Sequence, residues 1–299
     1  MEKRQFGKTD MQVSVLGFGG AEIGYQGVPA ETVETLLNGA LDAGLNVIDT
    51  AECYESGEEV IGRTVSHRRN DFYLFTKCGH PRGIGSEDWS QSSILESVER
   101  SLRRLKTDRV DLIQLHSCSE AVLKKGEVIA ALQAVRDRGY ARYIGYSGDS
   151  LAAKFAVESG AFDTLQTSVN IADQEAIELS VPRALELGMG VIAKRPIANV
   201  AWKSGHKPID SYHHTYWDRL RKLDYDFLRE NAIEESVAKA LRFTLGVPGV
   251  HTAIVGTSKA ERWQENAQLL AAGPLSAPEF EAIRSRWEEL APSTWIGQT

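Results

Sequence analysis

Residues 45–54 read Leu-Asn-Val-Ile-Asp-Thr-Ala-Glu-Cys-Tyr, and this stretch sets the pattern for the rest of the chain. Its apolar start, Leu45–Ile48, has the length and the residue types of a buried strand. The carboxylate of Asp49 follows at once, and the phenol of Tyr54 comes a few residues later. Ionisable groups directly after a buried strand are typical of a strand whose carboxyl end faces a catalytic site.

Two further apolar runs end in the same way. Phe72–Thr76 is followed by Lys77, and Asp111–Leu115 is followed by His116. In a barrel of parallel strands the carboxyl ends meet at one mouth. The sequence therefore predicts that a carboxylate, a phenol, an ammonium and an imidazole converge there.

Strand-like and helix-like patterns alternate along almost the whole chain. Strands are predicted over Val13–Phe18, Val47–Ile48, Tyr73–Thr76, Leu112–Leu115, Tyr143–Tyr146, Thr164–Gln166, Gly190–Ala193 and Thr252–Val255. Helices are predicted over Pro29–Gly44, Glu58–Val65, Ser92–Leu105, Glu127–Arg138, Asp149–Ser159, Ala184–Leu187, Glu234–Leu245 and Lys259–Leu270. Eight such units in 299 residues predict an α/β fold, a single closed (β/α)8 TIM barrel.

Three segments lie outside this repeat. Gln5–Val13 predicts an N-terminal β-hairpin, and Pro278–Leu290 predicts an extra C-terminal helix. Arg195–Asn231 is predicted to be a long loop on the catalytic face, where long loops are usually functional. No linker composition appears, so residues 1–299 are expected to form one domain.

A doubly wound open sheet is the competing architecture. Gly17-Phe18-Gly19-Gly20 superficially fits its dinucleotide-binding turn, but Glu22 stands where the third glycine belongs. The following helix also begins about ten residues too late for that turn. The barrel is therefore favoured.

The composition limits the partners of the chain. The net charge of −7, with basic residues scattered among acids, argues against nucleic acid and anionic membrane as partners. No apolar run approaches the roughly 20 residues that span a bilayer, and Met1–Gln5 does not lead into a signal-peptide core. Three cysteines without CxxC spacing favour reduced thiols. We expect a cytoplasmic protein, a monomer or small homo-oligomer.

The four polar residues together indicate proton delivery to a carbonyl oxygen. A phenol with a pKa of about 10 is a poor acid at neutral pH, and a neighbouring ammonium lowers that pKa. Lys77 can serve as the ammonium, Asp49 can hold Lys77, and His116 can orient the carbonyl. Singly, each has a simpler explanation as a turn former, a packing residue, a rim charge or a core histidine. Their order on consecutive strands is harder to explain in that way.

These residues resemble the motifs of the aldo-keto reductases. Asp49–Tyr54 with Gly57-Glu58-Glu59 is similar to the second-strand motif of that family, and Phe75-Thr76-Lys77 and Leu115-His116 match its lysine and histidine positions. The resemblance covers nearly the whole chain. It implies that Tyr54 is the general acid, Lys77 the group that lowers the pKa of Tyr54, Asp49 the support for Lys77, and His116 the carbonyl orienter.

A carbonyl reduction also needs a hydride donor, which indicates a nicotinamide. Barrels often bind phosphate near the seventh and eighth strands, and Ile254–Asn266 lies there and resembles the adenosine-phosphate motif of the family. Lys259 and Arg262 are one helical turn apart and can embrace a 2′-phosphate, which favours NADP(H) over NAD(H). The simpler explanation is that Thr257-Ser258 is an N-cap and Arg262 a surface charge. The residues expected to bind this part of the cofactor are Gly256, Thr257, Ser258, Lys259, Arg262, Glu265 and Asn266, with Gly20 and Asp49 also assigned to the cofactor.

The expected carboxamide end departs from the family pattern. Ser147 and Gln166 match the serine and glutamine that bind the nicotinamide amide, but Gly148 stands where asparagine is usual. Lys194-Arg195 replaces the aromatic residue that many relatives place under the nicotinamide. We expect both to contact the cofactor, with the Arg195 guanidinium as a candidate to stack on the ring.

The function predicted from these residues is NADPH-dependent reduction of an aldehyde or ketone to an alcohol, with Tyr25, Tyr54, Trp89 and His116 lining the substrate site and no metal. A nicotinamide-binding regulatory or sensor subunit on the same fold is the alternative. A metal-dependent barrel hydrolase built on His116 and Asp49 is a third hypothesis, weakened by the lack of further strand-end histidines. Cys53 and Cys118 are interpreted as small apolar fillers beside strand ends, with redox sensitivity as the other interpretation.

Overall fold

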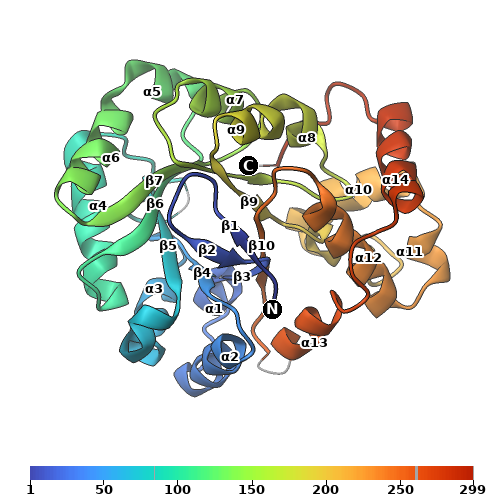
Figure 1. Cartoon of the computed structure of the whole chain (residues 1–299), viewed down its shortest axis with the longest axis horizontal. Coiled ribbons are helices and arrows are strands. Elements are labelled where there is room, and N and C mark those ends of the chain that lie inside the picture. Colours follow the sequence, from blue (N-terminus) through green and yellow to red (C-terminus); the bar gives the residue numbers. More distant parts are fainter. Residues whose placement is uncertain (84, 260–261, 299) are drawn as a thin grey trace.

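Eight parallel strands close into a barrel in the order β10-β3-β4-β5-β6-β7-β8-β9, which confirms the predicted fold class (Figure 1). The computed structural model describes residues 1–83, 85–259 and 262–298, and at positions 262, 264 and 266 it describes the backbone alone. The barrel strands are β3 (Leu16–Gly19), β4 (Val47–Asp49), β5 (Tyr73–Cys78), β6 (Val110–His116), β7 (Ala141–Ser147), β8 (Thr164–Ser168), β9 (Gly190–Lys194) and β10 (Thr252–Gly256). Seven of the eight predicted strands are found with their ends extended by no more than two residues.

The first predicted strand, Val13–Phe18, is wrong as one element. Its start belongs to β2 (Gln12–Ser14), which pairs antiparallel with β1 (Lys3–Gln5), and only its end enters the barrel as β3. The break lies at Ser14, whose hydroxyl donates to the Leu16 carbonyl at 2.6 Å while its N–H donates to Asn46 Oδ1 at 2.7 Å. These bonds end the hairpin register before the barrel begins.

The hairpin closes the amino end of the barrel, as Figure 1 shows with β1 and β2 lying across the ring of strands. It buries Phe6, Met11 and Val13 against Val47, Phe75, Leu112 and Ile192, which lie inside the barrel. This apolar plug accounts for a hairpin that precedes the eightfold repeat.

Helices surround the barrel and pack their apolar stripes on the outer faces of the strands. They are α1 (Ala21–Tyr25), α2 (Ala30–Asp42), α3 (Gly57–Thr64), α4 (Gln91–Leu105), α5 (Glu120–Lys125), α6 (Glu127–Asp137), α7 (Ser150–Glu158), α8 (Glu175–Leu179), α9 (Val181–Glu186), α12 (Ile233–Gly246) and α13 (Arg262–Gln268). A 3₁₀ segment, η1 (Ser66–Asp71), joins α3 to β5. The predicted C-terminal helix is α14 (Ala277–Leu290), and a capping box between Ser276 and Glu279 sets its start.

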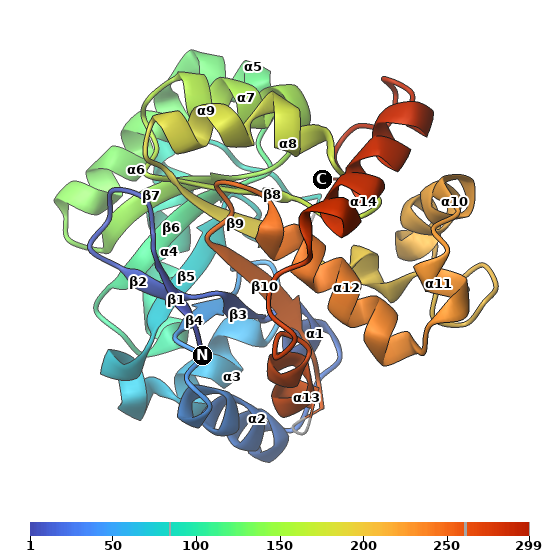
Figure 2. The same cartoon turned by 45° about the vertical axis from the view of Figure 1, so that its right-hand side comes forward.

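The segment predicted as a long loop, 195–231, is largely helical, so that prediction is corrected. It contains the 3₁₀ turns η2 (Ala198–Val200) and η3 (Ser211–His213) and the helices α10 (His214–Leu223) and α11 (Phe227–Glu230). Figure 2 shows α10 and α11 beside α12 and α14, at one side of the barrel. Tyr216, Leu220 and Leu223 of α10 enter a second apolar cluster with Ile283 and Trp287 of α14. These three residues of α10 stand at i, i+4 and i+7, a helical spacing that the prediction of a loop overlooked, and packing on α14 stabilises the helix.

No helix in the described ranges is long and apolar enough to cross a membrane.

Candidate active site

The structure brings the four predicted catalytic residues together at the carboxyl end of the barrel. Asp49 ends β4, Lys77 is the penultimate residue of β5, and His116 ends β6. Tyr54 follows β4 in the loop that leads to α3. Because β4, β5 and β6 are neighbours in the barrel, their ends present these side chains to one point.

The carboxylate of Asp49 is the centre of a buried network. Its Oδ1 accepts from the Lys77 ammonium, and its Oδ2 accepts from the amide nitrogens of Gln166 at 2.9 Å and Gln114 at 3.3 Å. The Lys77 ammonium also donates to the Thr50 carbonyl at 2.8 Å. Asp49 and Lys77 are each 1% exposed. A buried ion pair with this many extra hydrogen bonds holds both charges in a fixed geometry.

Two buried glutamates of the same motif fix the loop that carries Tyr54. The Glu52 carboxylate accepts from the Arg100 guanidinium of α4, and Glu58 accepts from the Thr76 hydroxyl of β5 at 2.6 Å. Both carboxylates are almost fully buried, so each is a fixed anchor rather than a solvated surface charge. The loop that carries Tyr54 is therefore held by a buried glutamate before it, Glu52, and by another after it, Glu58.

The Tyr54 ring is packed on three sides, but its hydroxyl is available. The Lys77 ammonium nitrogen lies 5.2 Å from the centroid of the Tyr54 ring, and the centroid of the Tyr25 ring lies 5.5 Å from it. The hydroxyl makes no hydrogen bond to any residue that the structure describes. Burial, with Asp49 adding to it, raises the pKa of Tyr54 well above 10, and Arg195 opposes this rise. The phenol therefore keeps its proton at neutral pH.

The His116 imidazole is held beside this phenol. Its ring lies edge-on to two others, with centroid distances of 5.8 Å to the Tyr54 ring and 5.3 Å to the His80 ring. His80 Nε2 donates to the His116 carbonyl at 2.8 Å, and His116 Nδ1 lies 3.3 Å from the Cys53 sulfur. Burial, together with the charge of Lys77, lowers the pKa of His116 well below 6.5, so the imidazole is neutral.

The residues expected at the nicotinamide carboxamide lie on adjacent strands. The Ser147 hydroxyl donates to Gln166 Oε1 at 3.0 Å, and Gln166 Nε2 is the donor to Asp49. One N–H of Gln166 and the lone pairs of Ser147 are left for a carboxamide, so this pair fits a nicotinamide. The glycine at 148 also has a reason, because a Cβ there would lie 2.5 Å from the Tyr146 hydroxyl oxygen.

Lys194 and Arg195 at the end of β9 have different surroundings. The Lys194 ammonium lies 2.7 Å from Asp149 Oδ2. Burial alone would raise the pKa of Asp149, but this ammonium brings it below its usual range. The Arg195 guanidinium lies over the Tyr212 ring at 5.2 Å and donates to the Tyr212 hydroxyl and the Gln298 carbonyl. Arg195 thus stacks on a side chain of the 195–231 segment, and the C-terminal residues lie beside it.

The loop after β10 presents the residues predicted for the phosphate end. Thr257 is buried and its hydroxyl accepts from the Lys259 N–H at 3.1 Å, while the Ser258 side chain is half-buried and that of Lys259 exposed. A hydroxyl pair and a free ammonium on one loop fit a phosphate group. The Glu22 carboxylate lies against Gly256, so close that a Cβ at Gly256 would lie 1.7 Å from it. Burial raises the pKa of Glu22.

The remaining cofactor predictions divide into three groups. Gly20 packs on β4, donating its N–H to the Asp49 carbonyl at 2.8 Å. Glu265 is exposed on α13. Arg262 and Asn266 belong to the same helix, but their side chains lie outside the described residues.

Besides Tyr54 and His116, two residues were predicted for the substrate site, and they lie at different distances from the catalytic residues. Tyr25 is 44% exposed and contacts the Tyr54 ring directly, so it forms part of the rim of the site. The centroids of the Trp89 and His80 rings are 5.7 Å apart. The indole of Trp89 also covers Gly79, where a Cβ would lie 2.1 Å from an indole carbon. Trp89 therefore lies behind His80, one ring further from His116.

Some site residues were not identified in the sequence. Gln114 is two positions before His116, so the alternation of a strand places it on the same side and could have indicated it. Asp149 was predicted only as the start of a helix. Glu22 reaches Gly256 through a contact between distant segments, which no sequence spacing indicates. Tyr212 belongs to the aromatic residues of 202–217 that the sequence offers as a pocket lining, but its contact with Arg195 could not be predicted. In the described part of the chain no group of three or more His, Cys, Asp or Glu side chains is arranged to hold a metal ion.

Comparison with known proteins gives a consistent result. The model of the Aldo/keto reductase family matches residues 15–288. The uncharacterized oxidoreductase YqkF of Bacillus subtilis (strain 168) is 31% identical, over 97% of this chain and 97% of its own length. The solved structure of aldo-keto reductase AKR11C1 from Bacillus halodurans in its holo form has a TM-score of 0.84 at 28% identity and covers 99% of both chains. A probable voltage-gated potassium channel subunit beta of Arabidopsis thaliana is 28% identical, over 93% of this chain and 94% of its own.

Proposed function

Because the chain belongs to the aldo/keto reductase family and is an NAD(P)-dependent oxidoreductase, we propose that it uses NADPH to reduce an aldehyde or ketone to an alcohol, with Tyr54 as the general acid. One observation carries this proposal. The Tyr54 hydroxyl, which has no hydrogen-bond partner among the described residues, stands beside a neutral imidazole and a fixed ammonium. That is the set of groups that a carbonyl oxygen needs as it gains charge.

The side chains have separate tasks in the reduction. When bound, a reduced nicotinamide supplies the hydride. His116 and Tyr54 hold the carbonyl oxygen by hydrogen bonds, and Tyr54 gives its proton to the alkoxide that forms. An alkoxide is a stronger base than a phenolate, so this transfer is favourable even though burial raises the pKa of Tyr54. The Lys77 ammonium then stabilises the phenolate that is left.

The raised pKa of Tyr54 also favours carbonyl reduction over alcohol oxidation at neutral pH. Reduction needs the protonated phenol, which is present below the pKa of Tyr54, whereas alcohol oxidation needs the phenolate. The reduction rate is therefore expected to fall only as the pH rises toward that raised pKa. Measuring kcat for both directions against pH tests this assignment.

We assign the loop after β10 to the 2′-phosphate of NADPH. The exposed ammonium of Lys259, next to the Thr257 and Ser258 hydroxyls, supports this assignment. Replacing Lys259 and Arg262 together by alanine is expected to weaken NADPH binding at least about tenfold while leaving NADH binding nearly unchanged, since charge-assisted contacts are each of order 1.5–3 kcal/mol. Dissociation constants for both cofactors check this. Lys203→Ala, an exposed lysine in another segment, is the control. An unchanged preference for NADPH in the double variant would show that the 2′-phosphate lies elsewhere.

The substrate is an uncharged or weakly polar carbonyl compound in this proposal, because the exposed rings of Tyr25 and Tyr212 lie beside Tyr54 and Arg195. The three cysteines are free and buried, as suits a protein of the reducing cytoplasm. An initial-rate screen of aliphatic and aromatic aldehydes and ketones with NADPH and NADH tests the function. Oxidation of NADPH by some members of the panel is expected.

The potassium channel beta subunit among the relatives favours a second candidate, a nicotinamide-binding subunit with little turnover. The same screen separates the two. Tight NADPH binding without oxidation across the whole panel would support the second candidate and reject the first.

A further inference from the structure

The thiol of Cys53 makes the only side-chain hydrogen bond to the His116 ring among the described residues. Its sulfur lies 3.3 Å from His116 Nδ1, within the reach of a sulfur hydrogen bond. Cys53 directly precedes Tyr54 and is 4% exposed. The hydrogen bond from His80 goes to the His116 backbone carbonyl, and the ring contacts with Tyr54 and His80 are edge-on, so neither engages an imidazole nitrogen of His116 as a hydrogen bond.

The chemistry of the two groups decides which of them donates. Burial raises the pKa of Cys53 to about 11, so the thiol keeps its proton at neutral pH. The nearby cations Lys77, Lys194 and Arg195, with His80, join burial in keeping His116 neutral. A neutral imidazole has one N–H and one unprotonated nitrogen, and that nitrogen accepts far better than a thiol sulfur. The arrangement S–H to Nδ1 therefore pairs the better acceptor with the thiol proton.

This donation determines the opposite nitrogen. With Nδ1 as the acceptor, the ring proton must be on Nε2. His116 Nε2 has no hydrogen-bond partner in the described part of the chain, so its N–H is left for an oxygen of a bound molecule. In the other tautomer Nε2 would present a lone pair to a carbonyl oxygen and repel it.

We propose that Cys53 is a positioning residue, whose thiol hydrogen bond holds His116 in the tautomer that offers an Nε2–H donor to the substrate carbonyl. The proposal rests on the proposed function for the role of that donor, but the tautomer itself does not depend on turnover. Cys53 then has a task beyond filling space at the end of a strand.

The direct test is the tautomer of His116, read by long-range ¹H–¹⁵N correlation spectra of protein carrying ¹⁵N-labelled histidine. A His116→Asn variant assigns the resonances. We expect the proton on Nε2 in the wild type and in Cys53→Ser, and a mixture of both tautomers in Cys53→Ala and Cys53→Val. A wild-type proton on Nδ1 would overturn the proposal, and this holds even if the Cys53 variants fail to fold.

Kinetics give the second measurement. Cys53→Ala is expected to lower kcat roughly tenfold with the NADPH dissociation constant unchanged, the size of one lost hydrogen bond. Cys53→Ser should restore most of that loss. Cys118→Ala removes another buried thiol and is the matched control, with kcat within about twofold of the wild type. Equal tautomers and equal kcat in wild type and Cys53→Ala would refute the positioning role. If no carbonyl is reduced by any form, the proposed function fails, and the spectra alone decide on Cys53.

Discussion

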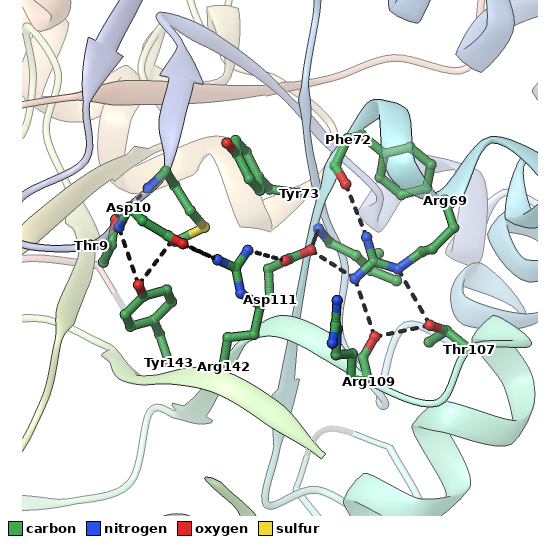
Figure 3. Close-up of polar contacts among 12 residues, drawn as sticks. Thr9, Asp10, Arg69, Phe72, Tyr73, Thr107, Arg109, Asp111, Arg142 and Tyr143 are labelled. Carbon is green, nitrogen blue, oxygen red and sulfur yellow. Dashed lines mark hydrogen bonds and ion pairs between the residues drawn. The ribbon is translucent and has the colours of Figure 1, made fainter. Parts of the chain in front are cut away.

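The two ends of the barrel each bury an aspartate in a polar network, and the two networks differ in what they leave free. At the amino end, Asp111 accepts from the Leu74 N–H at 2.9 Å and from the guanidinium groups of Arg69 at 2.7 Å and Arg142 at 2.8 Å. Arg142 continues to Asp10 of the hairpin (Figure 3). At the carboxyl end, Asp49 is as well satisfied, but the Tyr54 hydroxyl and His116 Nε2 have no hydrogen-bond partner among the described residues.

The same strands carry both networks. β6 begins next to Asp111 and ends at His116, and β5 and β7 likewise contribute to both ends. At the amino end the network runs from Asp10 of the hairpin through Arg142 and Asp111 to Arg69, and each of these four charges has a partner (Figure 3). Such a closed set can only stabilise the fold, whereas the open set at the other end can act on a ligand.

The largest effect is expected at the carboxyl end. Lys77→Met removes the ammonium and leaves the Asp49 charge buried without a cation, so we expect a loss of about 3–5 kcal/mol in the free energy of unfolding. The reduction rate should also fall at least about 100-fold. Urea denaturation and aldehyde-dependent NADPH oxidation measure the two effects.

A double variant separates these two effects. Asp49→Asn/Lys77→Met removes both charges and keeps an oxygen that Gln114 and Gln166 can reach. Much of the stability should return while the reduction rate stays low. Recovery of the rate along with the stability would mean that the ion pair only supports the fold.

At the amino end we expect a substitution to lower the stability and to leave the reduction rate nearly unchanged. Asp111→Ala leaves two arginines without their buried carboxylate, and because both are partly exposed we expect a loss of about 3 kcal/mol in the free energy of unfolding. The kcat of the folded fraction should stay within about twofold. Asp137→Ala, an exposed acid on α6, is the control and should change neither quantity. A large fall in kcat at a temperature where Asp111→Ala is folded would contradict the division between the two ends.

The smallest effect concerns Glu22, a carboxylate at the carboxyl end that, unlike Asp111, has no cation beside it among the described residues. Its charge lies against Gly256 and would repel a phosphate at that loop, so NADPH affinity should fall as the pH rises through the raised pKa of Glu22. Glu22→Gln should tighten NADPH binding about two- to fivefold at the higher pH. Fluorescence titrations across that pH range measure it, with Glu31→Gln as the control. Identical pH dependence in Glu22→Gln and the wild type would remove Glu22 from the cofactor site.

More of the network at the carboxyl end than of the network at the amino end could be predicted from the sequence. Asp49, Lys77 and His116 each follow an apolar run, and a parallel barrel collects strand ends, so local pattern and topology together are enough. Asp111 also lies on a strand, but its partners Arg69, Arg142 and Asp10 are distant charged residues that look like ordinary surface groups. No periodicity encodes which of them pair.

Two other features show the same limit. The prediction of a loop missed α10, although Tyr216, Leu220 and Leu223 stand at helical spacing, and only the structure shows that this apolar stripe packs on α14. The contact between Cys53 and His116 depends on how the loop after β4 bends back over β6, which the spacing of the two residues does not determine. Sequence patterns thus predicted the frame and the residues on it, and long-range side-chain contacts decided the rest.

The central claim is that chemistry belongs to the open network and stability to the closed one. A single-turnover measurement of NADPH oxidation by an aldehyde, comparing Tyr54→Phe with Asp111→Ala, tests it most directly. The account predicts that Tyr54→Phe binds NADPH and unfolds like the wild type but reacts at least about 100-fold more slowly, while Asp111→Ala reacts at nearly the wild-type rate and unfolds more easily. A Tyr54→Phe variant that reacts at the wild-type rate would contradict the account.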